Sequence, residues 1–353
     1  MSQGQTPSLQ VGGAPHLPPP RSVASIMREV LYALIPGILA HVWYFGPWIL
    51  FQLLIACTFA LLAEWAMLKL RQQPLKPFLS DYTAVVTAVL FVLCSPPLMP
   101  WWVSAIGMFF AIVIAKHLYG GLGQNRFNPA MVGYVAVLIA YPQVMTQWLP
   151  PQMLFDELGL RSLDIGQGLW IILTGTPPEA LTWDTISQAT PLDTLRQGAT
   201  KNLLINEIRV SPIFGQFGGW GWEWIANWYF LGGLWLLYRR VISWQVPVAA
   251  IATVVFLTLP FFLMDPDAHP FPMQHVFSGG IVLGAFFIAT DPVSGSSTPM
   301  GKLLFGVGIG LIMLVIRRWS AYPDGVAFAV LCMNMLAPLL DRYTRPRIYG
   351  HER

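Results

Sequence analysis

The chain has few charged residues. Only 10% of its 353 residues are Asp, Glu, Lys or Arg, whereas soluble domains carry about 25%. The formal net charge is +3, and no basic stripe is present, so the composition gives no sign of a nucleic-acid partner. Hydrophobic residues make up 55% of the chain and the mean hydropathy is +0.57. These values exclude an ordinary soluble enzyme and predict an integral membrane protein.

Cysteine is also scarce, with only three residues, Cys57, Cys94 and Cys332. All three lie in apolar segments, and no C-x-x-C or Cys/His spacing is present. We therefore expect no zinc or iron–sulfur site from this chain alone and interpret the cysteines as buried small hydrophobes. The first twenty residues are polar and rich in Pro and Gly, without the apolar run of a signal peptide. We expect a disordered cytoplasmic tail over residues 1–28.

Ten apolar runs predict an all-α membrane protein with about ten transmembrane helices. Several runs are shorter than the roughly 20 residues that a perpendicular span needs. The runs are 30–44, 48–68, 82–98, 101–114, 129–145, 222–238, 246–264, 276–290, 303–316 and 325–340. They divide the chain into a first membrane half (29–145), a long loop (146–221), a second membrane half (222–340) and a cytoplasmic C-terminal tail (341–353).

Basic residues orient these helices, because cytoplasmic segments carry an excess of Lys and Arg. With both termini cytoplasmic, one side of the membrane holds Arg21, Arg28, Lys69, Arg71, Lys76, Lys116, Arg126, Arg239, Arg240, Arg342, Arg345 and Arg347. The loop 146–221 then lies on the outer side. Arg317 and Arg318 are exceptions to this pattern.

Five runs on either side of the loop predict two halves of opposite orientation, as in inverted-repeat transporters. Pro- and Gly-rich interruptions occur in both halves, as CSPP (94–97), GGLGQNRFNP (120–129) and TDPVSG (290–295). Interrupted membrane helices free backbone groups, which then bond to a ligand, to water or to another helix. The alternative is that these segments are plain cytoplasmic turns.

The loop 146–221 is the one long polar stretch, and it contains the hydroxyl-rich run DTISQATPL (184–192). Loops placed by a rigid scaffold tend to carry function. Pro191 disfavours a helical Thr190 and favours an extended or turn conformation. Ala189 is small and leaves the Thr190 hydroxyl open to approach. From these residues alone, an ordinary polar turn is the alternative.

Five motifs in one order carry a resemblance to a known family. They are YGGLGQNRFNPAM (119–131), SQATPLDT (187–194), GAFFIATDPVS (284–294), YPDGVAFAVL (322–331) and DRYTRPRIYGH (341–351). Together they resemble the RnfD (RsxD) family, a family of membrane proteins of bacterial Rnf electron-transport complexes. That family is related to the NqrB protein of the sodium-pumping NADH:quinone reductase. The resemblance runs from about residue 21 to residue 351.

The resemblance implies a flavoprotein that carries FMN on a threonine through a phosphoester bond. A dedicated flavin transferase recognises an acceptor motif that reads approximately D-x-x-(S/T)-G-A-(T/S). Asp184, Ser187, Ala189 and Thr190 match this motif, and Gln188 stands where Gly is typical. A threonine hydroxyl is a weak nucleophile, so the transferase must activate it and the acceptor must be accessible. Thr190 is therefore the expected site of covalent FMN attachment.

The resemblance also implies a place in the bacterial inner membrane beside RnfA, RnfB, RnfC, RnfE and RnfG. The complex couples electron transfer between NADH and ferredoxin to the movement of Na⁺ or H⁺. Electrons would pass through the FMN of this chain. Related proteins have been described with a noncovalent riboflavin as well, and the loop 125–128 is one candidate location for it.

Ionisable residues inside membrane segments are costly and are candidates for function. Glu64 lies inside the second run and Asp291 ends the eighth, and we expect both to border an ion path. Glu64 has a structural alternative, which is a pair with Lys69 or a polar contact between helices. Asp291 has one as well, which is a cap or turn before Pro292. We interpret Lys116 and His117 as residues near the end of a span whose side chains extend toward the membrane interface.

Two further functions fit the membrane pattern without redox chemistry. One is a small-solute transporter or channel, which would have no need of a flavin attachment site. The other is a structural anchor for neighbouring proteins of the complex, in which loss of the Thr190 hydroxyl leaves electron transfer unaltered.

Overall fold

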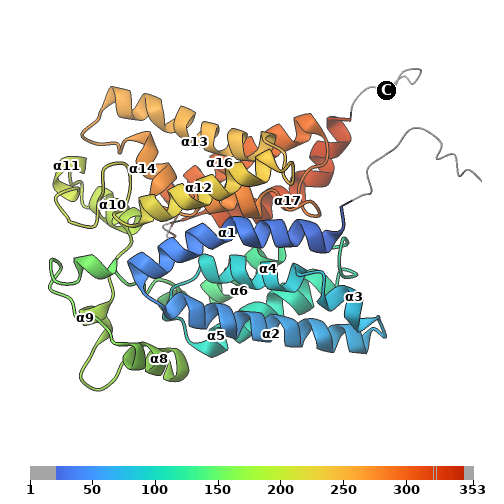
Figure 1. The fold of residues 1–353 in the computed structure, drawn as a ribbon. Coiled ribbons are helices and arrows are strands. Elements are labelled where there is room, and N and C mark those ends of the chain that lie inside the picture. The colour runs from blue at the N-terminus through green and yellow to red at the C-terminus, as the bar shows by residue number, and fades with distance from the viewer. Residues whose placement is uncertain (1–20, 321, 323, 346–353) are drawn as a thin grey trace, which may run out of the picture.

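The structure is a computed structural model that describes residues 21–320, 322 and 324–345. Within these ranges the regular elements are all helices (Figure 1). The first membrane half contains α1 (Val23–Phe45), α2 (Trp48–Leu70), α3 (Leu75–Leu79), α4 (Thr83–Leu93), α5 (Trp101–Met108), the π-helix η1 (Phe109–His117), α6 (Pro129–Ala140) and α7 (Pro142–Met145). The second contains α12 (Trp222–Tyr238), α13 (Gln245–Met264), α14 (Pro272–Phe277), α15 (Ile281–Leu283), the π-helix η3 (Gly284–Ile288), α16 (Pro299–Trp319) and α17 (Val326–Tyr343).

The chain is an all-α integral membrane protein. Six stretches of the described residues are apolar and long enough to cross a bilayer, namely Val23–Phe45, Trp48–Leu70, Leu75–Leu93, Gln245–Met264, Pro299–Trp319 and Val326–Tyr343. The other apolar runs form shorter or interrupted helices. The first helix begins at Val23, so residues 23–28 are not part of a tail; residues 1–20 lie outside the described residues. The last helix likewise continues to Tyr343, past the boundary expected at 340.

The two halves pack in equivalent ways. In the first half α2 packs against α4 and against α5 and η1, and these in turn pack against α6. In the second half α13 packs against α14, α15 and η3, and against α16, which packs on α17. The halves meet where α1 packs along α12 and α6 packs on α17. This repeated arrangement is the one expected for two five-helix repeats.

The contacts between α1 and α12 show that the halves run in opposite directions. At one end, Arg239 after α12 forms an ion pair of 2.6 Å with Glu29 near the start of α1. At the other end, Phe45 at the end of α1 packs on Trp222 at the start of α12, with ring centroids 4.8 Å apart. The two central helices are therefore antiparallel (Figure 1).

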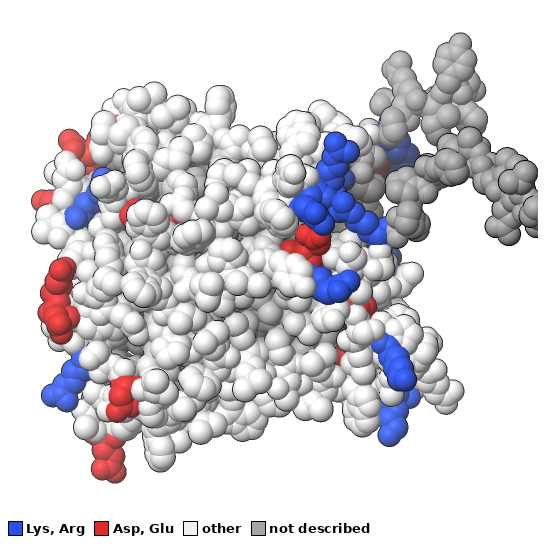
Figure 2. Space-filling view, in the orientation of Figure 1, with Lys and Arg blue, Asp and Glu red and all other residues white. Residues whose placement is uncertain are grey.

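Charge is distributed unequally between the two ends of the molecule. Figure 2 shows Lys and Arg concentrated at the end where α1 begins, and most Asp and Glu at the opposite end, where α8–α11 lie in Figure 1. We call these the basic end and the loop end. Arg317 departs from the charge pattern because it is buried and paired with Asp324 rather than flanking a span.

The loop 146–221 is folded rather than irregular. It contains η2 (Gln152–Leu154), α8 (Ile165–Thr174), α9 (Trp183–Ile186), α10 (Pro191–Thr200) and α11 (Ile205–Ile208). The apolar helix α8 packs on α2, where Gly168 lies directly against the Trp48 ring. This contact ties the loop to the membrane domain.

The structure rules out one alternative about local environment and corrects one expectation. The interruption at 94–97 is not a plain turn at the surface, because Ser95 is 1% exposed and its hydroxyl bonds back to the carbonyl of Phe91 at 2.8 Å. Cys332 is not a buried small hydrophobe, because it lies exposed on α17. A helix that spans a membrane can present such a residue to lipid without the cost of exposing it to water.

Candidate functional site

Thr190 is the N-cap residue of α10, at the loop end. Its backbone is extended (φ −65°, ψ 158°), as the following Pro191 predicts, and its hydroxyl oxygen accepts the amide N–H of Asp193 at 3.3 Å. The Thr190 side chain is half-buried rather than fully exposed. The hydroxyl therefore lies at the positive end of the α10 dipole, a position that favours anionic groups.

The residues that precede Thr190 hold it in place. Ile186 is fully buried, and the amide of Gln188 donates to the carbonyl of Trp148 at 2.9 Å. The Ser187 hydroxyl donates to the Trp183 carbonyl at 2.8 Å, which closes α9. Asp184 lies exposed in the first turn of α9. The motif thus presents its acid to solvent, while the segment around it is anchored.

A cavity opens beside Thr190 between the two membrane halves. Its volume is about 120 Å³. Residues from the loop and from both halves line it, including Cys94, Met131, Tyr134, Trp148, Thr190, Asp193, Trp222, Ser278, Gly280 and Asp324. Apolar and aromatic walls with a few polar groups are the lining that ligand pockets have in proteins. Thr190 lies where the cavity meets the loop 146–221.

The first turn of α10 packs closely against two glycines, Gly279 of the second membrane half and Gly219 of the loop. A Cβ at Gly279 would stand 2.5 Å from Leu192 Cδ1. Pro191 lies against Gly219 closely enough that a Cβ there would overlap its ring. Neither position has room for a side chain. Gly279 lets α10 approach the gap between α14 and α15, and Gly219 lets Pro191 pack closely within the loop. The position of Thr190 is thereby tied to that interruption.

The same interruption is held by an ion pair from the α16–α17 connection. Asp324 Oδ2 accepts the amide N–H of Gly280 at 2.7 Å, and Asp324 Oδ1 lies 3.1 Å from an Arg317 guanidinium nitrogen. The Arg317 side chain is 4% exposed and also donates to the His275 carbonyl. Arg317, Asp324 and Gly280 form what we call the latch. It satisfies a backbone amide that the helix break leaves free.

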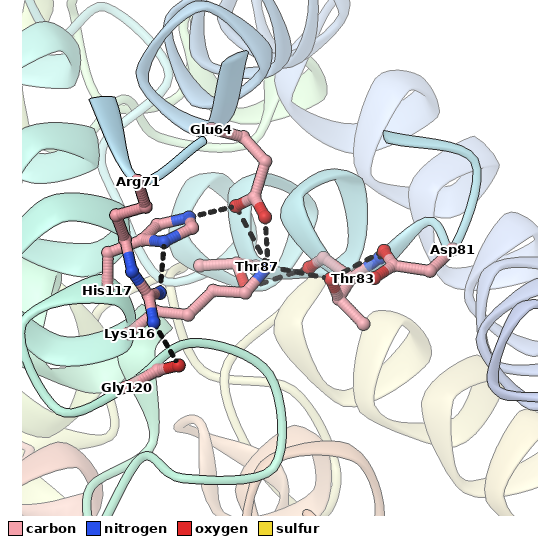
Figure 3. A network of polar contacts seen from close by, with 8 residues as sticks. All are labelled: Glu64, Arg71, Asp81, Thr83, Thr87, Lys116, His117 and Gly120. Carbon is pink, nitrogen blue, oxygen red and sulfur yellow. Dashed lines mark hydrogen bonds and ion pairs between the residues drawn. The ribbon is translucent and has the colours of Figure 1, made fainter. Parts of the chain in front are cut away.

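A second polar site, the basic-end network, lies within the first half (Figure 3). Glu64 on α2 is 1% exposed. The Lys116 ammonium on η1 contacts both of its carboxylate oxygens, at 2.9 and 2.8 Å. The same ammonium donates to the Thr83 hydroxyl at 2.8 Å, and Thr83 donates to Asp81 at 2.6 Å. One ammonium therefore joins α2, η1 and the start of α4.

His117 extends this network toward the surface. Its Nε2 lies 3.2 Å from the Glu64 carboxylate, and its Nδ1 lies 3.2 Å from an Arg71 guanidinium nitrogen. Arg71 donates in turn to the Gly120 carbonyl at 2.7 Å. Because a guanidinium can only donate, Nδ1 must accept, which leaves the proton of a neutral ring on Nε2, toward Glu64. The network links α2 to the turn that follows η1.

The geometry decides between the alternatives for Glu64 and Lys116. Lys69 is not the partner of Glu64; its ammonium lies 5.1 Å from the centroid of the Trp65 ring. The polar contact between helices is the alternative that the structure supports. Lys116 does not extend to the interface, because its residue is 3% exposed and its three short contacts all point inward.

Asp291 follows η3 and bonds within its own turn. Its carboxylate accepts the amide of Val293 at 3.2 Å and the hydroxyl of Ser294 at 2.7 Å. This is the turn-capping arrangement. The partners of Glu64 lie on η1, so the two carboxylates share no partner.

The interruptions at 120–129 and 290–295 are joined by side chains of Asn128 and of Asn334, which lies in the middle of α17. Asn334 on α17 accepts the amide of Asn128 at 3.0 Å and donates to the carbonyl of Ser294 at 3.0 Å. Asn128 in turn donates to the carbonyl of Ile288 at 3.2 Å. These side chains therefore satisfy backbone groups across the two halves. Asn128 acts as a structural clamp and the N-cap of α6.

The sequence alone points to no role for Asp324, Ser278 or Asn334. Asp324 lies in the motif at 322–331, and Arg317 is an exception to the charge pattern of the span ends. Pairing that exception with the nearby acid would have found the latch. No sequence signal distinguishes Ser278 or Asn334 from other polar residues in helices.

Comparisons with known proteins identify the family of the chain. Residues 10–350 match the model of the NQR2, RnfD, RnfE family. The chain is 46% identical over 350 residues to the D subunit of the ion-translocating oxidoreductase complex of Aliivibrio salmonicida, covering 97% of this chain and 99% of the relative. It is 45% identical over 352 residues to the Aeromonas hydrophila protein of that name, covering 98% and 99%. The corresponding Vibrio cholerae protein is 46% identical over 348 residues, covering 97% and 99%. The chain belongs to the NQR2, RnfD, RnfE family.

Proposed function

We propose that this chain is the RnfD component of an ion-translocating electron-transport complex and carries FMN esterified through its phosphate to Thr190. The observation that carries the proposal is the place of Thr190. Its hydroxyl stands at the N-terminus of α10 and at the edge of a cavity between the membrane halves. Electrons enter or leave the membrane domain through the flavin held there.

The residues present fit such a group. A phosphoester on Thr190 places its negative charge at the N-terminus of a ten-residue helix, where helix dipoles stabilise anions. The nearby Asp193 carboxylate is compensated, because Arg196 pairs with it at 2.8 Å. Trp148 and Trp222, whose ring centroids lie 5.0 Å apart, line the cavity beside Thr190. Bound FMN supplies one- and two-electron redox chemistry.

The exposed acid Asp184 and the half-buried Ser187 belong to the surface that the flavin transferase recognises. The transferase needs access to Thr190, and the α10 cap must open for the hydroxyl to react. The single 3.3 Å bond from Asp193 to the Thr190 oxygen is weak enough to permit this.

The orientation follows from the charges. The basic end faces the cytoplasm and the loop end faces the periplasm of a bacterial inner membrane, in agreement with the excess of Lys and Arg on cytoplasmic segments. Thr190 and its flavin are then periplasmic. RnfA, RnfB, RnfC, RnfE and RnfG are the partner proteins, and they supply the NADH and iron–sulfur sites. A noncovalent riboflavin is a further cofactor of the complex.

The ion path borders Glu64 and Asp291, and the ion is Na⁺ or H⁺. Glu64 is buried at the basic end among groups that already exchange hydrogen bonds, which is the setting in which membrane proteins move protons or small cations. Its carboxylate is compensated by Lys116. An ion that reaches Glu64 must therefore displace that ammonium or neutralise the pair.

Fluorescence in a denaturing gel tests the flavin proposal. The full chain, purified from cells with an active flavin transferase, should give a band that fluoresces under ultraviolet light after denaturation. The Thr190→Val variant should give a dark band of equal protein content. A dark band from the parent chain would instead favour a transporter or channel without redox chemistry.

A further inference from the structure

The cavity beside Thr190 contains a buried hydroxyl without a partner. Ser278 is 3% exposed, and its Oγ has no hydrogen-bond partner among the described residues. Ser278 nevertheless lines the same cavity as Thr190. Native proteins pair nearly all buried polar groups. An unpaired hydroxyl in the wall of a cavity therefore points to a ligand that supplies the missing bond.

A fixed carboxylate lines the cavity together with this hydroxyl. Asp324 lines the cavity. Its side chain is 27% exposed, whereas that of Arg317 is 4% exposed. The bonds from Gly280 and Arg317 hold both oxygens in place. Each carboxylate oxygen can accept more than one hydrogen bond, so Asp324 retains acceptor capacity toward the cavity.

The remaining walls are largely apolar and aromatic, with Leu93, Met131, Leu283 and Val326 among the lining residues. The cavity thus combines apolar sides with one wall that offers a hydroxyl and a carboxylate. A flavin ring has the matching character. It is a flat aromatic system with one polar edge, and that edge carries an N–H donor beside carbonyl acceptors.

We propose that Ser278 and Asp324 receive the polar edge of the flavin ring tethered to Thr190, and that the Asp324–Arg317 pair sets its reduction potential. This inference rests on the proposed function. Ser278 supplies a hydroxyl that donates or accepts, and Asp324 supplies an acceptor and a negative charge. Arg317 acts through Asp324, as a positioning residue that balances this charge.

The sign of each charge effect follows from electrostatics. Reduction adds negative charge to the ring, so a carboxylate beside it disfavours electron uptake and a guanidinium favours it. Asp324→Asn removes the carboxylate and leaves Arg317 uncompensated, which raises the midpoint potential. Arg317→Gln leaves Asp324 uncompensated, which lowers it. A merely structural role for the pair predicts no such opposition of sign.

The experiment is a spectroelectrochemical titration of the purified full chain after intact mass has verified the attached FMN. We expect a higher midpoint potential in Asp324→Asn and a lower one in Arg317→Gln. In Ser278→Ala, loss of a contact to the ring should shift the visible absorption bands and increase the native fluorescence. The matched control is Asp267→Asn, which removes an exposed carboxylate bonded to Asn206 and outside the cavity. The control should match the parent in every measurement.

The outcomes separate this inference from the proposed function. A parent chain without the mass of FMN overturns the proposed function. The inference alone is overturned if the parent, Asp324→Asn and Ser278→Ala all carry FMN and the two variants keep the midpoint potential and the spectrum of the parent. Asn at 324 keeps the shape of Asp and an oxygen for the Gly280 amide, so this variant tests the charge even where Arg317→Gln does not fold.

Discussion

Leu192 of α10 lies directly against Gly279. Leu192 is two residues after Thr190, and Gly279 lies in the gap between α14 and α15. The contact joins the loop that presents Thr190 to an interrupted helix of the second half. The position of Thr190 over the cavity depends on this close approach.

Gly279→Ala should displace α10 from the membrane domain. The new Cβ would stand 2.5 Å from Leu192 and 2.6 Å from Arg317, and overpacking of this kind costs about 1–3 kcal/mol. We expect a lower midpoint of thermal unfolding and faster proteolysis within residues 146–221. The adjacent Gly280→Ala is the control, because the nearest atom to its Cβ is 3.4 Å away. Equal effects of the two variants would contradict the proposed contact.

Glu64→Gln should destabilise the protein by removing the partner of a buried ammonium. Breaking a buried pair typically costs about 3–5 kcal/mol, because Lys116 is left charged and uncompensated. The double variant Glu64→Gln with Lys116→Met should recover much of that stability in thermal unfolding. If the double variant is no more stable than Glu64→Gln alone, the pair does not have the structural role described.

The same double variant distinguishes a structural role of Glu64 from a role in ion transport. If Glu64 borders the ion path, proteoliposomes of the whole complex with the double variant should lose ion transport although the protein is folded. Transport at the rate of the parent would remove Glu64 from the path. Lys69→Met, which changes a lysine outside the network, serves as the control for loss of positive charge.

Much of the fold is predictable from the sequence, and the reasons are physical. Each of the ten apolar runs contains helix, because membrane interiors require every backbone group to bond internally. The extended backbone of Thr190 follows from Pro191 alone. The folded loop is not predictable in the same way, because α8 is a short apolar helix within a polar stretch. Hydropathy cannot tell a helix that packs on α2 from part of a polar loop.

The contacts of the site were less predictable. Lys116 and Glu64 are 52 positions apart and Asp324 and Gly280 are 44 positions apart, so each pair depends on how the helices pack. An acidic residue within a membrane segment predicts that a polar partner is present, but the sequence does not identify which residue that partner is. Of the two structural alternatives for Glu64, the structure shows the polar contact between helices and not the pair with Lys69, whereas a place on the ion path stays a prediction.

Asn334→Ala should loosen the junction of the two halves that Asn128 and Asn334 form. The change leaves the amide of Asn128 and the carbonyl of Ser294 without their partner, and each unpaired buried group costs about 1–3 kcal/mol. For the two groups together we expect a loss of about 2–6 kcal/mol in denaturant unfolding. Asn206→Ala, at an exposed asparagine bonded to Asp267, should cost less than about 0.5 kcal/mol. Similar losses in both variants would argue against the junction.

The Thr190→Asn variant separates the N-capping of α10 from the attachment of flavin. Asn is a good N-cap residue, so α10 and the overall stability should be retained within about 0.5 kcal/mol. The amide side chain has no hydroxyl to esterify, so flavin attachment should be lost. A stable, folded Thr190→Asn protein that still carries covalent flavin would move the attachment site to another residue.

Intact-mass spectrometry with peptide mapping tests the attachment of FMN to Thr190 most directly. The full chain, purified from cells with an active flavin transferase, should carry the added mass of one FMN, less one water, on the peptide that contains Thr190. The Thr190→Asn protein from the same cells should show the unmodified mass. An unmodified parent chain, or an FMN adduct mapped to a different residue, would contradict the proposed site.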